Sequence, residues 1–417
     1  MVVTLIVLAV ILFFVLVIWS IKRHRDPRLQ VGCDAPIEQL IPSLAGLSLS
    51  APVDGNSVEI LENGAYFDVL LEEIAAARHS VHFETFLWKE GVLGKRLADA
   101  LCARARAGVT VRVLLDANGT NQMGKAIEQQ LKDAGCKLTK FHPLDWRHIG
   151  VFNERDHRKL VVLDGRTAFV GGHCIVDTWL GNAEDGKNFA DISVRLRGPI
   201  VHSVQAAFSE NWVGQTGELF MGDEVFPLLE RAGNVTAHAA YVKPEGSAPA
   251  VKLLHHAVIG TARKRLWIQN PYFIPEPEAI DAFGAAVARG VDVRVLMPST
   301  GGSDNPMVQH AGHRNFEKLL RCGVRLFEYP HTLLHQKVMT VDGAWCTVGS
   351  ANFDDRSFEI NEEITLGFKD AATAERLDQI FEKYAARASE INLEAWRKRG
   401  WKHRLIDNYY YMFNEVL

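Results

Sequence analysis

Paired cysteines and an excess of charge of either sign are both missing from this sequence. Its six cysteines stand singly, with no C-x-x-C pair, which argues against a disulfide framework and favours reduced thiols in a cytosolic setting. The 46 basic and 50 acidic residues give a net charge of −4, which argues against a surface built throughout for nucleic acid and leaves only a local basic groove open. With 47% hydrophobic residues, the chain has the composition of a globular protein with sizeable cores.

A long uncharged segment opens the chain. Residues 2–21 read VVTLIVLAVILFFVLVIWSI, and a helix of this length spans about 30 Å, the thickness of a bilayer core. A cleaved signal peptide needs a basic start, a shorter apolar run and a small-residue cleavage site, none of which is present. We therefore expect one transmembrane helix. The basic residues that follow it are Lys22, Arg23, Arg25 and Arg28. By the positive-inside tendency they predict a single-pass protein of the cell (inner) membrane with the rest of the chain in the cytoplasm.

The rest of the chain alternates helical and strand patterns and repeats itself. GVTVRVLLD at 108–116 matches GVDVRVLMP at 290–298, and each follows an alanine-rich helical pattern. The spacing between the two matching segments predicts two similar α/β domains of about 180 residues each. The expected divisions are a transmembrane helix (1–21), a juxtamembrane linker (22–55), a first domain (56–233) and a second domain (234–417).

Each copy contains the same short motif, DHRKLVVLDG at 156–165 and LHQKVMTVDG at 334–343. We expect each to form a half-buried strand, with its histidine and lysine on one face about 6 to 7 Å apart. The Asp-Gly pair predicts a two-residue hairpin turn behind it. A pseudo-twofold pairing of the domains would bring the histidines and lysines of both copies into one cleft. These residues are His157, Lys159, His335 and Lys337.

Two histidines with two lysines suit a phosphodiester. A neutral imidazole can attack the phosphorus while a second, protonated imidazole gives a proton to the leaving oxygen. The lysines would hold the non-bridging oxygens, and we expect no metal and no cofactor. Asp164 and Asp342 close the motifs, but seven extended residues cover about 23 Å, so a role in the turn is expected for both. In two-residue hairpins, Gly172 and Ser350 lie opposite the histidines and leave room for substrate.

The paired motifs, together with NPYFIPE at 270–276 and GSANFDDRSFEINEE at 349–363, resemble the phospholipase D superfamily and, within it, the bacterial cardiolipin synthases. The resemblance implies two similar α/β domains with mixed β-sheets flanked by helices, one active site at their interface and a phosphatidyl-histidine intermediate. It places His157, Lys159, Asp164, His335, Lys337 and Asp342 in the catalytic motifs. We take His157 as the nucleophile and His335 as the acid.

Further site residues follow from the same resemblance. An acid beyond each histidine orients it, which points to Asp191 and Glu363, with Glu362 as the competing choice. Asn352 would contact the phosphate, and Ser350 is counted with it as a substrate-binding candidate. The first copy departs from this pattern because GGHC at 171–174 has no counterpart of Asn352.

The expected function is transfer of a phosphatidyl group between two phosphatidylglycerol molecules at a membrane, with release of glycerol and no nucleic-acid partner. A phospholipase D hydrolase or a nuclease of the same superfamily is the alternative, and the intact motifs argue against a non-catalytic scaffold. His310 and His313 could share a helix face, but without nearby acids we expect no metal there. The segment from Trp396 mixes basic and aromatic residues, which fits either a membrane-interface segment or a solvated helix.

Overall fold

The computed structural model describes residues 2–21, 29–33, 35–143, 153–184, 186–242 and 249–414. The chain divides into two compact units, residues 1–32 and 33–417. The first unit contains helix α1 (Val2–Ile21), whose described apolar side chains, among them Leu5 and Phe13, are exposed. Among the residues that the structure describes, no helix is both long and apolar enough to cross a membrane. The transmembrane helix therefore stays a prediction.

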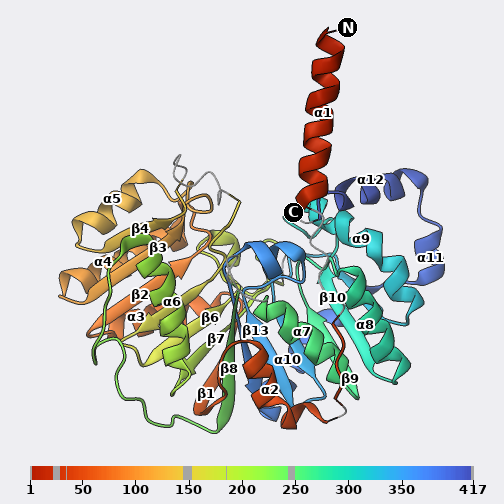
Figure 1. Cartoon of the computed structure of the whole chain (residues 1–417). Coiled ribbons are helices and arrows are strands. Elements are labelled where there is room, and N and C mark those ends of the chain that lie inside the picture. The colour runs from red at the N-terminus through yellow and green to blue at the C-terminus, as the bar shows by residue number, and fades with distance from the viewer. Residues whose placement is uncertain are drawn as a thin grey trace. The chain divides into compact units, whose positions relative to one another are not determined.

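The second unit is built on one mixed sheet of 15 strands (Figure 1). Read outward from its centre, one half has the order β1-β7-β6-β5-β2-β3-β4 and the other the order β8-β14-β13-β12-β9-β10-β11-β15. The strands of the first half are β1 (Val53–Glu62), β2 (Ser80–Thr85), β3 (Thr110–Asp116), β4 (Lys137–Phe141), β5 (Leu160–Leu163), β6 (Thr167–Gly171) and β7 (Ile192–Arg197). Those of the second half are β8 (Val235–Val242), β9 (Arg265–Gln269), β10 (Asp292–Pro298), β11 (Arg325–Tyr329), β12 (Val338–Val341), β13 (Trp345–Gly349), β14 (Glu363–Lys369) and β15 (Ser389–Glu390).

The two halves repeat one strand order, as the sequence duplication predicts, and they meet where β1 pairs antiparallel with β8. In each half three strands run parallel, β2-β3-β4 and β9-β10-β11, and the other pairings are antiparallel. The expected mixed α/β fold is therefore confirmed. Both halves belong to one compact unit, and the domain boundaries at 233 and 234 stay predictions.

Helices cover both faces of the sheet (Figure 1). A core cluster shared by the two halves packs α6 (Val201–Thr216) and α10 (Ala371–Ala385) on strands of both. A second cluster packs the strands of the first half on α3 (Ala65–Ala76), α4 (Val92–Arg106) and α5 (Lys125–Asp133). A third packs the second half on α2 (Ile41–Leu47), α7 (Ala250–Thr261), α8 (Pro277–Ala288) and α9 (Pro306–Arg321). The chain ends in α11 (Leu393–Arg397) and α12 (Trp401–Tyr411). Because helices lie on both sides, central strands such as β5 and β12 are buried along their whole length.

Part of the segment predicted as a linker packs in the core of the second half. Ile37, Ile41 and Leu44 are buried in the core cluster of the second half, and β1 already begins at Val53. Apolar side chains of this segment have a core to enter, because they lie beside the helices and strands of the second half.

The motif strands are shorter than predicted, and their hairpins are shifted by one residue. Strand β12 begins only at Val338, so His335 and Lys337 precede it, and β12 is wholly buried rather than half-buried. In the first hairpin Leu163 pairs with Thr167, because residue 166 bonds across the turn and lies outside the ladder. The second hairpin repeats this shift. The predicted placement of two small residues directly opposite the histidines is therefore wrong.

Candidate active site

Each histidine motif is fastened to the opposite half of the sheet. Asp156 forms a parallel bridge with Glu362, and Leu334 forms one with Ala190. The His157 amide donates to the Glu362 carbonyl at 3.0 Å, and the His335 amide donates to the Ala190 carbonyl at 2.7 Å. The two motif segments therefore enter one region from opposite halves of the unit.

The two acids are exchanged between the halves. His157 Nδ1 lies 2.8 Å from Glu363 Oε1, and His335 Nδ1 lies 2.7 Å from Asp191 Oδ2. The expectation that each acid orients the histidine of its own copy is therefore wrong, because the bridges place each motif beside the strand start of the other half. An ionised carboxylate at Nδ1 holds the proton there and leaves Nε2 with the lone pair.

Glu362, the competing acid, contacts an arginine instead. Arg158 is fully buried and donates to Glu362 and, at 3.0 Å, to the Ala207 carbonyl. Side chains 362 and 363 start from neighbouring residues at the beginning of β14, so they point in different directions. Glu363 therefore faces the imidazole, while Glu362 neutralises a buried cation.

The two lysines lie beside their own histidines. Lys159 Nζ donates to the His157 carbonyl at 2.5 Å, and Lys337 Nζ donates to the His335 carbonyl at 2.7 Å. Both lysines are buried. Burial lowers the pKa of Lys337 to about 7, although Asp191 opposes this and Lys159 adds to it. A bound anion would offset the repulsion between these cations.

Mutual electrostatic effects connect the four residues. Burial lowers the pKa of His157 well below its usual value, and the charges of Lys159, Lys337 and His335 lower it further. Burial also lowers the pKa of His335, with a contribution from Lys337, while Asp191 opposes the change. The site thus gathers four basic side chains in a desolvated region, which favours an anionic ligand.

The two acids differ in charge at neutral pH. Burial raises the pKa of Asp191, but the charges of His335 and His173 and the bond from His335 outweigh it, and the pKa falls to about 2. Burial raises the pKa of Glu363 to about 7, with Lys159 opposing the rise. Asp191 is therefore ionised at pH 7, whereas Glu363 is partly protonated.

The aspartates at the end of each motif hold turns. The Asp164 carboxylate accepts from the amides of residues 78, 79 and 80 at 2.7 to 3.2 Å, and Asp342 does the same for residues 263 to 265 at 2.7 to 3.3 Å. Both aspartates have positive φ, 52° and 54°. Their contacts fix the loops that lead into β2 and β9. The two aspartates lie just after β5 and β12, at the ends of these strands that are remote from the histidines.

The small residues after each motif serve the acids. Ser350 donates to Glu363, and it also accepts from the Ile364 amide at 3.0 Å. At the matching position a Cβ on Gly172 would lie 2.3 Å from Asp191 Oδ1. Ser350 therefore donates a hydrogen bond to Glu363, and Gly172 leaves space for the Asp191 carboxylate. Neither residue has the predicted role of leaving room for substrate.

Asn352 differs from its counterpart in the first half, Cys174. Within the described part of the chain, Asn352 Oδ1 is buried without a hydrogen-bond partner. Cys174 is buried, and burial raises its pKa to about 11, so it is a neutral thiol at pH 7. Polar contacts to a bound anion are therefore expected from the second half rather than equally from both.

Two aromatic residues at the site escape sequence reasoning. Trp179 Nε1 donates to Asp191 Oδ2 at 2.8 Å, and its ring meets the His335 ring edge-on at 5.2 Å. The Phe86 ring lies 4.9 Å from the His157 ring, and Lys159 Nζ lies 5.1 Å from its centre. Phe86 directly follows β2, so its place at a strand end is a usable signal. Nothing in the local sequence around Trp179 indicates its role.

Replacement of Gly172 by alanine is expected to lower activity about tenfold to a hundredfold, because the added Cβ displaces the carboxylate that holds His335. Gly214→Ala is the matched control, since a Cβ there meets nothing within 4 Å. Steady-state product formation and thermal unfolding of both variants check this. Equal activity of the two variants would contradict the close packing of Gly172 and Asp191.

The family profile that matches this chain and two of its curated relatives are described as cardiolipin synthases. The family profile described as "Cardiolipin synthase, PLD-like domain" matches residues 70–212 and 256–385, one stretch in each half. Cardiolipin synthase 2 of Bacillus anthracis is 33% identical over 383 residues, which cover 91% of this chain and 74% of that protein. Cardiolipin synthase of Geobacillus sp. (strain WCH70) is 32% identical over 353 residues, covering 84% and 70%. The crystal structure of phosphatidylserine synthase from Haemophilus influenzae Rd KW20 shares the fold, with a TM-score of 0.66 at 13% identity over 86% of this chain and 95% of that one.

Proposed function

Because the chain belongs to the cardiolipin synthase family of phospholipase D-like proteins, we propose that it joins two phosphatidylglycerol molecules into cardiolipin and releases glycerol. Membership of this family makes it an enzyme, a phosphatidyltransferase. The observation that carries the proposal is the exchanged pair of histidine–acid contacts, His157 with Glu363 and His335 with Asp191. This arrangement offers one nucleophile and one acid to a single phosphodiester.

In the first step His157 Nε2 attacks the phosphorus of phosphatidylglycerol. A P–N bond forms, the P–O bond to the glycerol headgroup breaks, and His335 gives its Nε2 proton to the departing oxygen. In the second step the hydroxyl of another phosphatidylglycerol gives its proton to His335 and attacks the same phosphorus. The P–N bond breaks, and free His157 is restored with cardiolipin as the product.

The unequal acids support this division of roles. An ionised Asp191 stabilises the protonated form of His335, which the general acid needs. His157 has cations around it and an acid whose pKa is about 7, so its neutral, nucleophilic form is favoured. Lys159 and Lys337 would stabilise the negative charge on the non-bridging oxygens, and the Asn352 amide NH₂ would add a further contact.

A lipid surface beside the enzyme is part of the proposal. Four residues of α12 and its end are largely exposed, Trp401 (71%), Leu405 (62%), Tyr409 (57%) and Met412 (66%). Their spacing of three to four residues places them along one face of the helix. Such an apolar stripe fits the interface of a bilayer rather than water.

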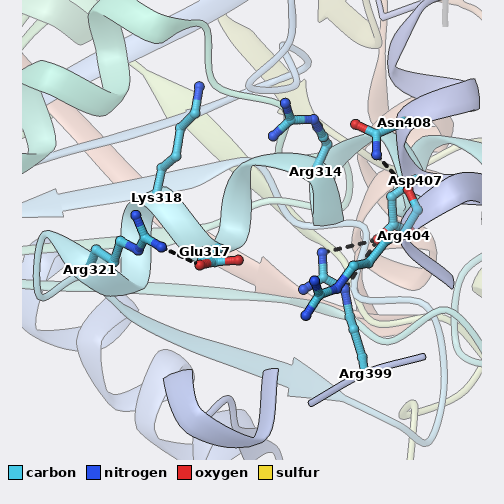
Figure 2. A pocket seen from close by; sticks show the side chains of 8 residues that line it. All are labelled: Arg314, Glu317, Lys318, Arg321, Arg399, Arg404, Asp407 and Asn408. Atoms are coloured by element: carbon cyan, nitrogen blue, oxygen red, sulfur yellow. Dashed lines mark hydrogen bonds and ion pairs between the residues drawn. The ribbon is translucent and has the colours of Figure 1, made fainter. Parts of the chain in front are cut away.

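A basic pocket between α9 and α12 adds charge to this surface. It has a volume of about 320 Å³, and Figure 2 shows the side chains around it. They are Arg314, Glu317, Lys318, Arg321, Arg399, Arg404, Asp407 and Asn408. Five cations against two acids favour an anionic partner, and anionic phospholipid headgroups meet that requirement next to an apolar stripe. We also retain the anchor at residues 2–21, with the domains on the cytoplasmic side, as part of this proposal.

Purified full-length protein given phosphatidylglycerol alone is expected to form cardiolipin and an equal amount of free glycerol. Mass spectrometry of the lipid extract and an enzymatic glycerol assay check both products. Phosphatidic acid as the main lipid product would replace the transferase with a hydrolase, and cleavage of a nucleic-acid diester without lipid turnover would replace it with a nuclease. Both outcomes keep the chemistry of the two histidines. The hydrolase changes the acceptor of the phosphatidyl group to water, and the nuclease changes the diester that is cleaved.

A further inference from the structure

A second cluster of histidines lies outside the two motifs, on α9 and α12. His310 and His313 lie three residues apart on α9, and His403 and Asp407 lie four residues apart on α12. Both spacings place the pair on one helix face. We propose that these four side chains form a binding site for one divalent transition-metal ion, with Zn²⁺ as the best fit.

The spacing of the ligand atoms supports a tetrahedral site. His310 Nδ1 lies 2.9 Å and His403 Nε2 3.3 Å from Asp407 Oδ1, and His313 Nδ1 lies 3.2 Å from His403 Nε2. All four atoms lie within 4.8 Å of one another. Around Zn²⁺, with bonds of about 2.0 to 2.1 Å, neighbouring ligand atoms are about 3.3 Å apart. The observed separations therefore need only small adjustments to enclose the ion.

Hydrogen bonding alone explains this cluster poorly. Three imidazole nitrogens lie around Asp407 Oδ1, at 2.9, 3.3 and 3.9 Å, and only the shortest of these contacts is a hydrogen bond. Nδ1 of His313 and Nε2 of His403 also face each other, so at most one of them can be the proton donor between them. A metal ion uses the lone pairs of all three imidazoles at once.

Outer contacts hold the ligands as metal sites require. His313 Nε2 lies 2.9 Å from Glu328 Oε1, which fixes the ring with Nδ1 toward the cluster. Arg399 Nη2 lies 3.3 Å from Asp407 Oδ2 (Figure 2). The imidazole nitrogens lie around the other carboxylate oxygen, Oδ1. Asp407 is fully buried.

The site would fasten α12, near the end of the chain, to α9. Four protein ligands fill a tetrahedral shell, so the ion would have a structural role and no open position for substrate. From the sequence no metal is expected at His310 and His313, because the two ligands from α12 come 90 to 97 residues later in the chain.

The full chain, purified in detergent and stripped with a chelator, is expected to bind one Zn²⁺ per molecule and to unfold at a higher temperature once loaded. His403→Ala and Asp407→Asn should each reduce the bound zinc at least tenfold and remove the thermal shift. His79→Ala, an exposed histidine outside the cluster, should bind as the wild type does. Elemental analysis and thermal unfolding measure these results without any assay of catalysis.

Co²⁺ provides a second measurement in case Asp407→Asn folds poorly. The wild type should give the visible absorption of tetrahedral Co²⁺. The His403→Ala variant, which changes a partly exposed side chain, should not give it. Zinc binding that is equally strong in the wild type and both ligand variants would overturn the site, and so would a wild type that binds none.

Discussion

Replacement of His157 by alanine is expected to abolish both cardiolipin formation and covalent labelling of the protein. Without an imidazole near Glu363, no P–N bond can form, and a fall of at least about ten-thousandfold is expected for loss of a nucleophile acting with an acid. Radiolabelled phosphatidylglycerol, quenched during turnover, would give chain-bound label in the wild type and none in this variant.

His335→Ala separates the two roles. Its rate of turnover with phosphatidylglycerol is expected to fall about a hundredfold to ten-thousandfold, because the leaving oxygen receives no proton. An ester with a nitrophenolate leaving group needs no such proton, so this variant should recover much of its rate of covalent labelling, whereas His157→Ala should not. His79→Ala serves as the control for folding and assay conditions.

Two results would change this assignment. Label retained in His157→Ala and lost in His335→Ala would exchange the roles of the histidines. Near-normal turnover of phosphatidylglycerol in either variant would contradict a single site built from both halves.

Much of the fold follows from patterns that a single copy of the sequence already contains. Apolar runs such as residues 108–116, each next to a helical pattern, specify buried strands, and their second occurrence specifies a second half with the same strand order. The spacing of histidine and lysine likewise singles out the motif residues. The limits of the elements are less predictable, because burial of Ile37 and Ile41 depends on a core formed by residues far along the chain.

The contacts across the site depend on how the halves face each other, which no local pattern encodes. Sequence distance suggests that Asp191 orients His157, but the bridge between Ala190 and Leu334 places Asp191 beside His335. The choice between Glu362 and Glu363 is of the same kind, since it requires knowing which strand face meets the imidazole. A shift of one residue in each hairpin also cannot be deduced from an Asp-Gly pair alone.

Neutralising the two acids is expected to have unequal effects. Asp191→Asn removes a carboxylate that is ionised throughout the working range, since its pKa is about 2, and with it the support for protonated His335. A fall of about a hundredfold to ten-thousandfold is expected, comparable to loss of the acid itself. Glu363→Gln replaces a group whose pKa is about 7 by one that resembles its protonated form. We therefore expect the rate of cardiolipin formation to fall about tenfold at pH 8 and less at pH 6. Asp99→Asn, at an exposed acid, is the control.

The pH profile makes this asymmetry measurable. As pH rises through about 7, Glu363 loses its proton, accepts the Nδ1 proton of His157 more strongly and makes Nε2 a better nucleophile. Activity of the wild type should therefore contain a limb that rises near pH 7, and Glu363→Gln should lack that limb. Asp191→Asn should keep the rising limb at a much lower rate, because it retains Glu363 and because Asp191 does not titrate near pH 7. Rates of cardiolipin formation between pH 5.5 and 8.5 test this, and an unchanged rising limb in Glu363→Gln would show that a group other than Glu363 controls the nucleophile.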